Sequence, residues 1–296
     1  MDRLTPLAVP AQGILARCDA GSVSPAVAIM ELLILTEDAE LATDLVRGSS
    51  RFSCHGALLQ LLDTHRAGAL SVAEMLQSDM DTPPENATAE EGVAFCRRLF
   101  DWSVVQNEAA SVALYSLGDA ALLASATKEI IDWLLGLGVL QRGRDVLDLG
   151  CGIGRITRAM APIVRSVTGV DISTRMLERA RERCAGFANV RLRESSGLDL
   201  HGLSTASFDV ALAVDTFPYL VQSAISLAET HVAEASRLLR PSGELVVLQF
   251  SYRGDAQEDA SDMARFAAAH GFLVATSGLR PFTLWNGLAF RLVRRS

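Results

Sequence analysis

The 296-residue sequence predicts an α/β fold, in which a mostly parallel sheet of seven strands follows an all-helical N-terminal domain. From residue 145 onward, short apolar runs alternate with amphipathic segments, which is typical of parallel strands joined by helices. Residues 1–85 instead keep the helical period and have no strand-like alternation. We therefore expect three parts: a helical accessory domain at residues 1–85, a helical lid or connector at 86–140, and the α/β domain at 141–296.

Start and stop signals delimit the helices before the sheet. Ser24-Pro25 is an N-cap followed by a proline at the first helical position. Ser71 and Glu74 have the spacing of a capping box and predict another helix start. Pro83-Pro84 forbids a continuous helix, so a linker is expected there. Helices are expected at residues 26–35, 39–47, 53–66, 90–108 and 120–137.

The strands of the α/β domain are short and apolar. Five parallel strands are expected at residues 146–149, 166–170, 190–193, 209–214 and 244–250. Helices are expected between them at residues 155–163, 173–184 and 223–239. Two further runs, residues 272–276 and 284–293, predict an antiparallel hairpin that ends the sheet. Ligands in such folds bind beyond the carboxyl ends of the strands, where the strand order reverses.

Composition argues against several classes of partner and site. The net charge of −8 and the pI near 5.2 disfavour a protein that binds nucleic acid non-specifically, since such proteins need a basic surface. Lys128 is the only lysine and follows no glycine-rich run, which excludes a Walker-type phosphate loop. The five cysteines form no C-x-x-C pair, so no metal site is expected.

Targeting signals are also absent from the sequence. No apolar run reaches the roughly 18 uncharged residues that a membrane span needs, so no membrane partner is expected. The first residues lack the basic-then-apolar order of a signal peptide. A cytoplasmic protein is therefore expected.

The segment Asp145-Val-Leu-Asp-Leu-Gly-Cys-Gly-Ile-Gly-Arg155 runs from an apolar strand through three alternate glycines into a helix. Such a turn brings backbone N–H groups close to a ligand. Asp148 lies within the apolar run, and its burial costs several kcal/mol by rough estimate unless it has a partner, which a ligand could supply. A dinucleotide fold needs a small residue where Arg155 stands, and Asp148 would repel a pyrophosphate. The ligand is therefore expected to be cationic, whereas a plain tight turn is the alternative.

A second acidic residue, Asp171, ends the second strand 21 residues after Gly150. At that position a carboxylate can accept hydrogen bonds from both hydroxyls of a ribose. Together, Asp148 and Asp171 predict a nucleoside that carries an amino-acid tail. For Asp171 alone, an acid at a helix N-terminus remains the alternative reading.

Three blocks resemble those of class I S-adenosylmethionine-dependent methyltransferases: Leu147-Asp-Leu-Gly-Cys-Gly-Ile-Gly-Arg155, Gly169-Val-Asp-Ile-Ser173 and Arg240-Pro-Ser-Gly-Glu-Leu245. The resemblance covers residues 140–296 and implies a Rossmann-like sheet with S-adenosylmethionine as cofactor and S-adenosylhomocysteine as product. The cofactor-binding residues that it implies are Asp148, Gly150, Cys151, Gly152, Gly154, Asp171, Ile172, Ser196, Gly197, Asp215 and Tyr115.

The resemblance assigns roles to several of these residues. Asp148 and the glycine turn would hold the methionine portion, Asp171 the ribose and Ile172 the adenine. Cys151 is a common small residue in such turns and is given no chemistry. The family often has an acid near the adenine amino group, and Ser196 with the Gly197 N–H replaces it here.

The methyl acceptor is expected beyond the fourth strand, at Val214-Asp-Thr-Phe-Pro-Tyr219. This segment resembles the D/N-P-P-aromatic motif of amino-group methyltransferases in position, but it has an extra residue and only one proline. Asp215 and Tyr219 are the catalytic candidates, and an acid on a solvent-facing loop is the alternative for Asp215. The substrate-binding candidates are Phe217, Tyr219, Tyr252 and Trp285, and core packing is an equal alternative for Phe217 and Tyr219. Tyr115 lies where related enzymes place a lid.

The sequence thus predicts methyl transfer from S-adenosylmethionine to a small-molecule acceptor by in-line displacement, with nitrogen or oxygen as the expected methylated atom. Because the leaving thioether is neutral, the enzyme mainly has to align the acceptor and exclude water. Two alternatives remain open: a non-methylating enzyme that uses the same cofactor or a derivative, and a cofactor-binding partner subunit. The apolar faces of residues 1–85 fit an acceptor pocket and a homodimer interface, and a plain accessory helix bundle fits them as well.

Overall fold

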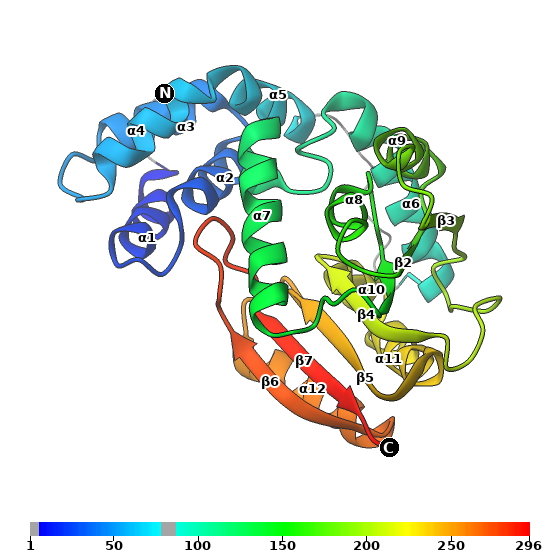
Figure 1. Cartoon of the computed structure of the whole chain (residues 1–296). Coiled ribbons are helices and arrows are strands. Elements are labelled where there is room, and N and C mark those ends of the chain that lie inside the picture. The colour runs from blue at the N-terminus through cyan, green and yellow to red at the C-terminus, as the bar shows by residue number, and fades with distance from the viewer. Residues whose placement is uncertain (1–5, 78–86) are drawn as a thin grey trace. The chain divides into compact units, whose positions relative to one another are not determined.

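The computed structural model describes residues 6–77 and 87–296 (Figure 1). The chain divides into two compact units, which we call the helical unit and the α/β unit. The helical unit comprises Met1–Asp81, Trp102–Glu129 and Phe282–Asn286. The α/β unit comprises Thr82–Asp101, Ile130–Pro281 and Gly287–Ser296. Two long helices, α6 (Ala89–Gln106) and α7 (Ala120–Gly136), belong partly to each unit.

The helical unit is organised around α2. Its elements are α1 (Ala8–Asp19), α2 (Pro25–Thr36), α3 (Ala39–Arg47), α4 (His55–Thr64), α5 (Arg66–Leu76) and the short 3₁₀ helix η1 (Leu114–Ser116). Helix α2 is strongly apolar, with Glu31 as its one charged residue, and its Ile29, Leu32 and Leu33 are fully covered. The predicted start of α2 is confirmed, because the Ser24 hydroxyl accepts a hydrogen bond from the Val27 N–H at 3.1 Å.

The predicted capping box at Ser71 is wrong. Helix α5 begins at Arg66, directly after α4 ends at Thr64, so Ser71 lies inside a helix. Its hydroxyl accepts a hydrogen bond from the Asn107 side chain at 3.2 Å, a contact that the local spacing could not indicate. The predicted linker at residues 81–86 lies outside the described residues.

The α/β unit contains a seven-stranded sheet of order β3-β2-β1-β4-β5-β7-β6, which confirms the predicted fold class. Its strands are β1 (Asp145–Leu149), β2 (Ser166–Asp171), β3 (Val190–Glu194), β4 (Phe208–Val214), β5 (Leu239–Leu248), β6 (Phe272–Leu279) and β7 (Ala289–Arg294). Strands β1 to β5 are parallel, whereas β7 is antiparallel to both β5 and β6. The order reverses between β1 and β4, so a ligand is expected at their carboxyl ends.

Helices cover this sheet. They are α8 (Arg155–Met160), α9 (Thr174–Cys184), α10 (Phe217–Ser223), α11 (Ile225–Leu238) and α12 (Ala256–Ala269). Helices α8 and α9 pack against β2, and α11 and α12 pack against β5 and β6. The short helix α10, which carries Phe217 and Tyr219, was not predicted.

Two strand boundaries differ from the prediction. Strand β5 begins at Leu239, five residues before the predicted start at Glu244, and its pairing with β4 is irregular between Leu239 and Glu244. Strand β7 begins at Ala289, five residues after the predicted start at Leu284. The Leu284 backbone is bound elsewhere, because its carbonyl accepts from Ser24 at 3.0 Å and its N–H donates to Glu129 at 3.0 Å.

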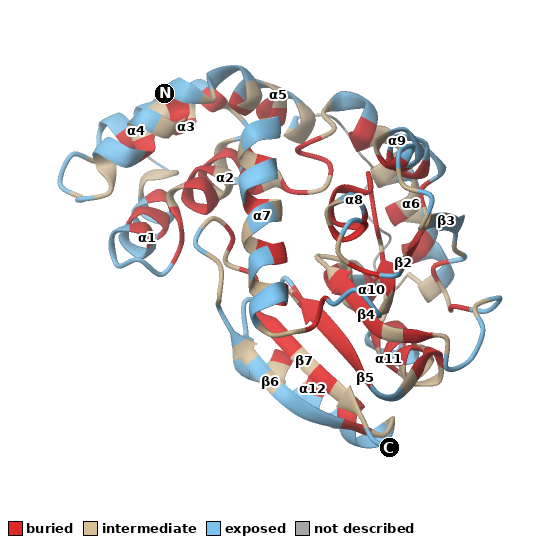
Figure 2. Ribbon diagram, in the orientation of Figure 1, coloured by how far each residue is buried: buried red, intermediate tan, exposed pale blue. Residues whose placement is uncertain are grey.

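The central strands are buried and the edge strand β6 is exposed (Figure 2). Strands β1, β4 and β5 lie within the core, where Phe217, Phe250 and Phe290 are nearly fully covered. The buried strands therefore hold the ends of β1 and β4 rigidly. Among the described residues, no helix is long and apolar enough to cross a membrane.

Candidate functional site

The glycine turn after β1 has a backbone that side chains would disrupt. Gly150, Gly152 and Gly154 have φ values of 70°, 52° and 73°, in the left-handed region that favours glycine. A Cβ atom on Gly150 would lie 2.3 Å from the Thr216 hydroxyl oxygen. That hydroxyl donates to the Leu149 carbonyl at 2.8 Å and so links the ends of β1 and β4. The turn is thus fixed by close packing.

Asp171, at the end of β2, is held by backbone groups. Its carboxylate accepts hydrogen bonds from the Gly152 and Ser173 N–H groups, each at 2.8 Å. Only 9% of the residue is exposed, and burial raises its pKa, opposed by these backbone hydrogen bonds. A carboxylate can accept about four hydrogen bonds. The two bonds to the backbone therefore fix the orientation of Asp171 and leave acceptor capacity for a pair of ligand hydroxyls.

Asp148, within β1, is almost fully buried. Its predicted need for a partner is met within the chain, because the Thr157 hydroxyl of α8 donates to it. Burial raises the pKa of Asp148 to about 6, although the Thr157 hydrogen bond and the positive charge of Arg155 oppose that rise. A cation placed near Asp148 would favour its ionised form.

The loop after β3 packs closely on Ile172. Gly197 has a φ of 79°, and a Cβ atom there would lie 2.7 Å from Ile172 and 2.7 Å from Val93 of α6. The Gly197 N–H donates to the Ser195 hydroxyl at 3.1 Å, and the Ser196 hydroxyl accepts from the Leu198 N–H at 3.2 Å. The polar groups predicted to bind adenine thus have partners in their own loop, and their adenine contacts stay predictions.

Asp215, at the end of β4, forms a cluster with two tyrosines. It adopts a left-handed φ of 58°, and its carboxylate accepts a hydrogen bond from the Tyr252 hydroxyl at 2.7 Å. The Tyr219 ring meets Tyr252 edge to face at 5.8 Å and Phe100 at 4.8 Å. We call Asp215, Tyr219 and Tyr252 the acidic–aromatic cluster.

The electrostatics of this cluster favour a proton acceptor near neutral pH. Burial raises the pKa of Asp215 to about 6, although the Tyr252 hydrogen bond and the charge of Arg155 lower it. Burial and the nearby Asp215 charge raise the pKa of the Tyr219 and Tyr252 hydroxyls. Both tyrosines therefore stay protonated at pH 7, while most of Asp215 is ionised.

Four other predicted residues are packed within their own units. Phe217 is 1% exposed and packs against Phe250 at 5.9 Å, so the core-packing alternative accounts for its burial. Cys151 is buried in the turn. Tyr115 and Trp285 both belong to the helical unit, where their rings stack at 5.8 Å. Their predicted roles as lid and substrate contacts stay predictions.

Sequence reasoning missed four residues that shape the site: Thr157, Thr216, Val93 and Phe100. Both threonines had a signal, since Thr157 follows the glycine-turn segment by two residues and Thr216 lies within the segment from Val214 to Tyr219. Val93 and Phe100 had none, because they reach the site from α6, far away in the sequence. Among the described residues, no group of three or more His, Cys, Asp or Glu side chains is placed to hold a metal ion.

Comparison with known proteins agrees with this geometry. The model of a family described as a methyltransferase domain matches residues 146–243. A demethylmenaquinone methyltransferase of Tropheryma whipplei is 35% identical over 156 residues, which are 53% of this chain and 59% of that protein. The chain thus spans little more than half the length of this curated relative.

Two solved structures share the fold. Magnesium protoporphyrin IX methyltransferase from Synechocystis, with bound S-adenosylmethionine, aligns with a TM-score of 0.55 and 18% identity over 71% of this chain and all of that one. Phosphoethanolamine N-methyltransferase 1 from Haemonchus contortus aligns with a TM-score of 0.56 and 18% identity, covering 70% of this chain and 50% of that one. Residues 146–243 therefore match a methyltransferase domain, and the chain shares the fold of these two enzymes.

Proposed function

We propose that the protein is an S-adenosylmethionine-dependent methyltransferase that acts on a small molecule. The observation that carries this proposal is the pair of buried acids, Asp148 and Asp171, on either side of a turn with three left-handed glycines. A dinucleotide would place a pyrophosphate against Asp148, whereas S-adenosylmethionine places an ammonium group in that region. The names of curated relatives, among them the demethylmenaquinone methyltransferase, support a small-molecule acceptor.

Residues of this chain would hold the cofactor by its three parts. Asp148 and the turn from Gly150 to Gly154 would bind the methionine portion, Asp171 would accept from the ribose hydroxyls, and Ile172 would pack on the adenine. When bound, the cofactor supplies an electrophilic methyl group on a sulfonium, with a neutral thioether as leaving group.

The acidic–aromatic cluster would receive the acceptor. Asp215 has a pKa near the pH at which a general base works best, so it can take the proton that an O–H or N–H acceptor loses. The Tyr219 and Tyr252 rings can orient an aromatic or cationic acceptor beside it. We therefore propose a nitrogen or oxygen acceptor and in-line methyl transfer, with Asp215 and Tyr219 as the catalytic residues.

The part of the chain before the sheet has a proposed supporting role. We keep the division into residues 1–85, 86–140 and 141–296 as a proposal about domains. Within the helical unit, the rings of Tyr115 and Trp285 are buried and stack on each other, and we keep their lid and substrate-binding roles as proposals. Light scattering on the purified full chain tests the alternative use of residues 1–85 as a homodimer interface.

One experiment tests the function as a whole. S-adenosylmethionine is titrated into the full chain by calorimetry, and formation of S-adenosylhomocysteine is then followed with a panel of phenols, hydroquinones, carboxylic acids and amines. We expect binding and product formation with at least one class of acceptor. Binding without product from any acceptor would favour the non-methylating enzyme or the partner subunit, and failure to bind would contradict the proposal entirely.

A further inference from the structure

The loop that carries Tyr252 is tied to a buried carboxylate eight residues away in the chain. Asp259 of α12 is 1% exposed, and its Oδ1 accepts hydrogen bonds from the Ser251 hydroxyl at 2.6 Å and the Arg253 guanidinium at 2.8 Å. The Arg253 N–H also donates to the Ser251 hydroxyl at 3.2 Å. Both sequence neighbours of Tyr252 are therefore bound to the same carboxylate.

Tyr252 is only partly buried. The residue is 48% exposed, although its hydroxyl lies 2.7 Å from Asp215, where burial raises the pKa of that hydroxyl. An exposed tyrosine on a loop would normally sample several rotamers, which costs conformational entropy whenever one is selected. The backbone on either side of Tyr252 therefore has to supply much of the order that its side chain needs.

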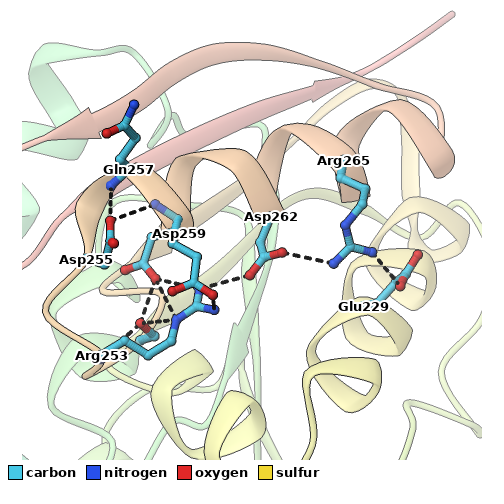
Figure 3. A network of polar contacts seen from close by, with 9 residues as sticks. Glu229, Arg253, Asp255, Gln257, Asp259, Asp262 and Arg265 are labelled. Atoms are coloured by element: carbon cyan, nitrogen blue, oxygen red, sulfur yellow. Dashed lines mark hydrogen bonds and ion pairs between the residues drawn. The ribbon is translucent and has the colours of Figure 1, made fainter.

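Further polar contacts surround the hydrogen bonds that Ser251 and Arg253 make with Asp259 (Figure 3). Arg253 also pairs with Glu258 at 2.8 Å and Asp262 at 2.9 Å, and its guanidinium lies over the Phe250 ring. Asp262 in turn binds Arg265 at 2.9 Å. Before Tyr252, Gln249 has a left-handed φ of 67° and donates from its side chain to the Ser251 carbonyl.

An ion pair with one buried partner, such as Asp259 with Arg253, is weak evidence for a role in stability. Taking the Asp259 charge out of water costs about as much as its attraction to Arg253 returns, so an apolar pair of similar volume often serves stability as well. What an ion pair supplies is direction, since each hydrogen bond fixes an angle as well as a distance. Here the hydrogen bonds to Asp259 orient the loop whose Tyr252 hydroxyl donates to Asp215.

We infer that Asp259, through Ser251 and Arg253, is a positioning residue that holds the Tyr252 hydroxyl against Asp215. Its expected effect on methyl transfer rests on the proposed function, whereas the position of Tyr252 does not. Besides Tyr252, the groups that face Asp215 are Tyr219 of α10 and Arg155 of α8. In Asp259→Asn the carboxylate charge that holds Arg253 is lost, while those two groups stay in place.

The three tyrosines of the chain allow a direct test. Full-length protein labelled with 3-fluorotyrosine gives few ¹⁹F signals, and Tyr252→Phe identifies the one from Tyr252. In wild type we expect this signal to titrate with Asp215 near pH 6, a step that Asp215→Asn removes. Asp259→Asn should abolish the step, whereas Glu258→Gln, which loses only an exposed partner of Arg253, should keep it.

The variants and readouts keep the inference falsifiable. If Asp259→Asn fails to fold, Ser251→Ala removes the same link with a smaller disturbance and should weaken the step. An unchanged titration of Tyr252 in a folded Asp259→Asn or Ser251→Ala variant would overturn the inference. The NMR experiment needs no acceptor, so its outcome is independent of whether methyl transfer is found.

Activity then tests the catalytic consequence. Asp259→Asn should lower kcat about 10- to 100-fold, the cost of misplacing a group by about 1 Å, and leave the affinity for S-adenosylmethionine unchanged. Asp259→Asn combined with Tyr252→Phe should be no slower than Tyr252→Phe alone, because both remove one contact. Effects that multiply in the double variant would mean that Asp259 acts independently of Tyr252 and would overturn the inference.

Discussion

At the carboxyl ends of β1 and β2, the polar groups of the candidate cofactor site come from one short stretch, residues 148–173, and several are backbone N–H groups. At the ends of β4 and β5, the groups of the acidic–aromatic cluster are side chains from separate elements. Asp215 follows β4, Tyr219 lies on α10, and Tyr252 follows β5.

This difference indicates that substitutions have different consequences in the candidate cofactor site and in the acidic–aromatic cluster. Backbone donors are fixed by the fold of the turn, so the cofactor side keeps its geometry as long as glycine occupies the left-handed positions. The acceptor side depends on side-chain orientation and on the hydrogen bonds that tie Ser251 and Arg253, on either side of Tyr252, to Asp259. It can therefore be altered residue by residue, with consequences for the acceptor and little effect on the cofactor.

The largest expected effect comes from Gly150→Ala. A residue with a Cβ atom at a φ of 70° costs about 1–2 kcal/mol, and the new methyl group would displace Thr216 from the Leu149 carbonyl. We expect affinity for S-adenosylmethionine to fall roughly 100-fold or more because the N–H groups of the turn are misplaced. Calorimetry measures the loss.

Gly143→Ala is the matched control for this substitution. A Cβ atom on Gly143 meets nothing within 4 Å, so binding should stay as in wild type. Wild-type affinity in Gly150→Ala would mean that the turn is not the cofactor site.

Asp171→Asn should have the next largest effect. The amide would turn an NH₂ group toward either the Gly152 or the Ser173 N–H, and the charged acceptor for the ribose would be lost. Hydrogen bonds to charged groups contribute about 2 kcal/mol, so affinity should fall roughly 30-fold. Glu178→Gln, on the exposed face of the adjacent helix α9, is the control. Equal affinities in the two variants would contradict a ribose contact at Asp171.

The effect of pH on the free energy of unfolding should be smaller, and it reports on Asp148 alone when wild type is compared with Asp148→Asn. Because its pKa in the folded protein is about 6 and thus above the ordinary value of 3.8, folding favours the protonated form. Stability from this group is therefore present at pH 5 and lost as the pH rises through 6. Asp148→Asn should gain about 1 kcal/mol relative to wild type between pH 5 and pH 7, measured by urea unfolding.

Cofactor binding should show the opposite trend. A cationic ligand needs the ionised form of Asp148, so affinity for S-adenosylmethionine should rise up to about tenfold between pH 5 and pH 7 and level off above pH 7. Asp148→Asn should remove this rise. Equal slopes for wild type and variant in calorimetric titrations would contradict an ammonium group near Asp148.

The smallest effect is expected from Ser196→Ala. The Ser196 hydroxyl is exposed and accepts from the Leu198 N–H, which makes it a turn residue of its own loop. If that is its whole role, affinity for S-adenosylmethionine should change by less than about twofold, as for most exposed polar substitutions. A loss of about tenfold would instead support the predicted adenine contact, and fluorescence competition with adenosine would locate it.

The helical part of the chain is where local sequence signals were least complete. The cap at Ser24 was predicted because Ser followed by Pro favours a helix start through local interactions alone, and the structure confirms it. The capping box at Ser71 failed because its hydroxyl binds Asn107, 36 residues away, within a helix that had already begun. Similarly, the strand predicted to begin at Leu284 begins only at Ala289, because Ser24 and Glu129 bind the Leu284 backbone.

The sequence alone determined the alternation of strands and helices, the glycine turn, Asp148 and Asp171, because these depend on local periodicity and on backbone conformations that few residues adopt. Tertiary structure alone decided that Thr157 partners Asp148, that Phe217 enters the core, and that Tyr252 meets Asp215. Those contacts join residues from different elements, and hydrophobic burial, which has no direction, does not specify them in advance. Only once the strands are packed side by side do their ends bring these side chains together.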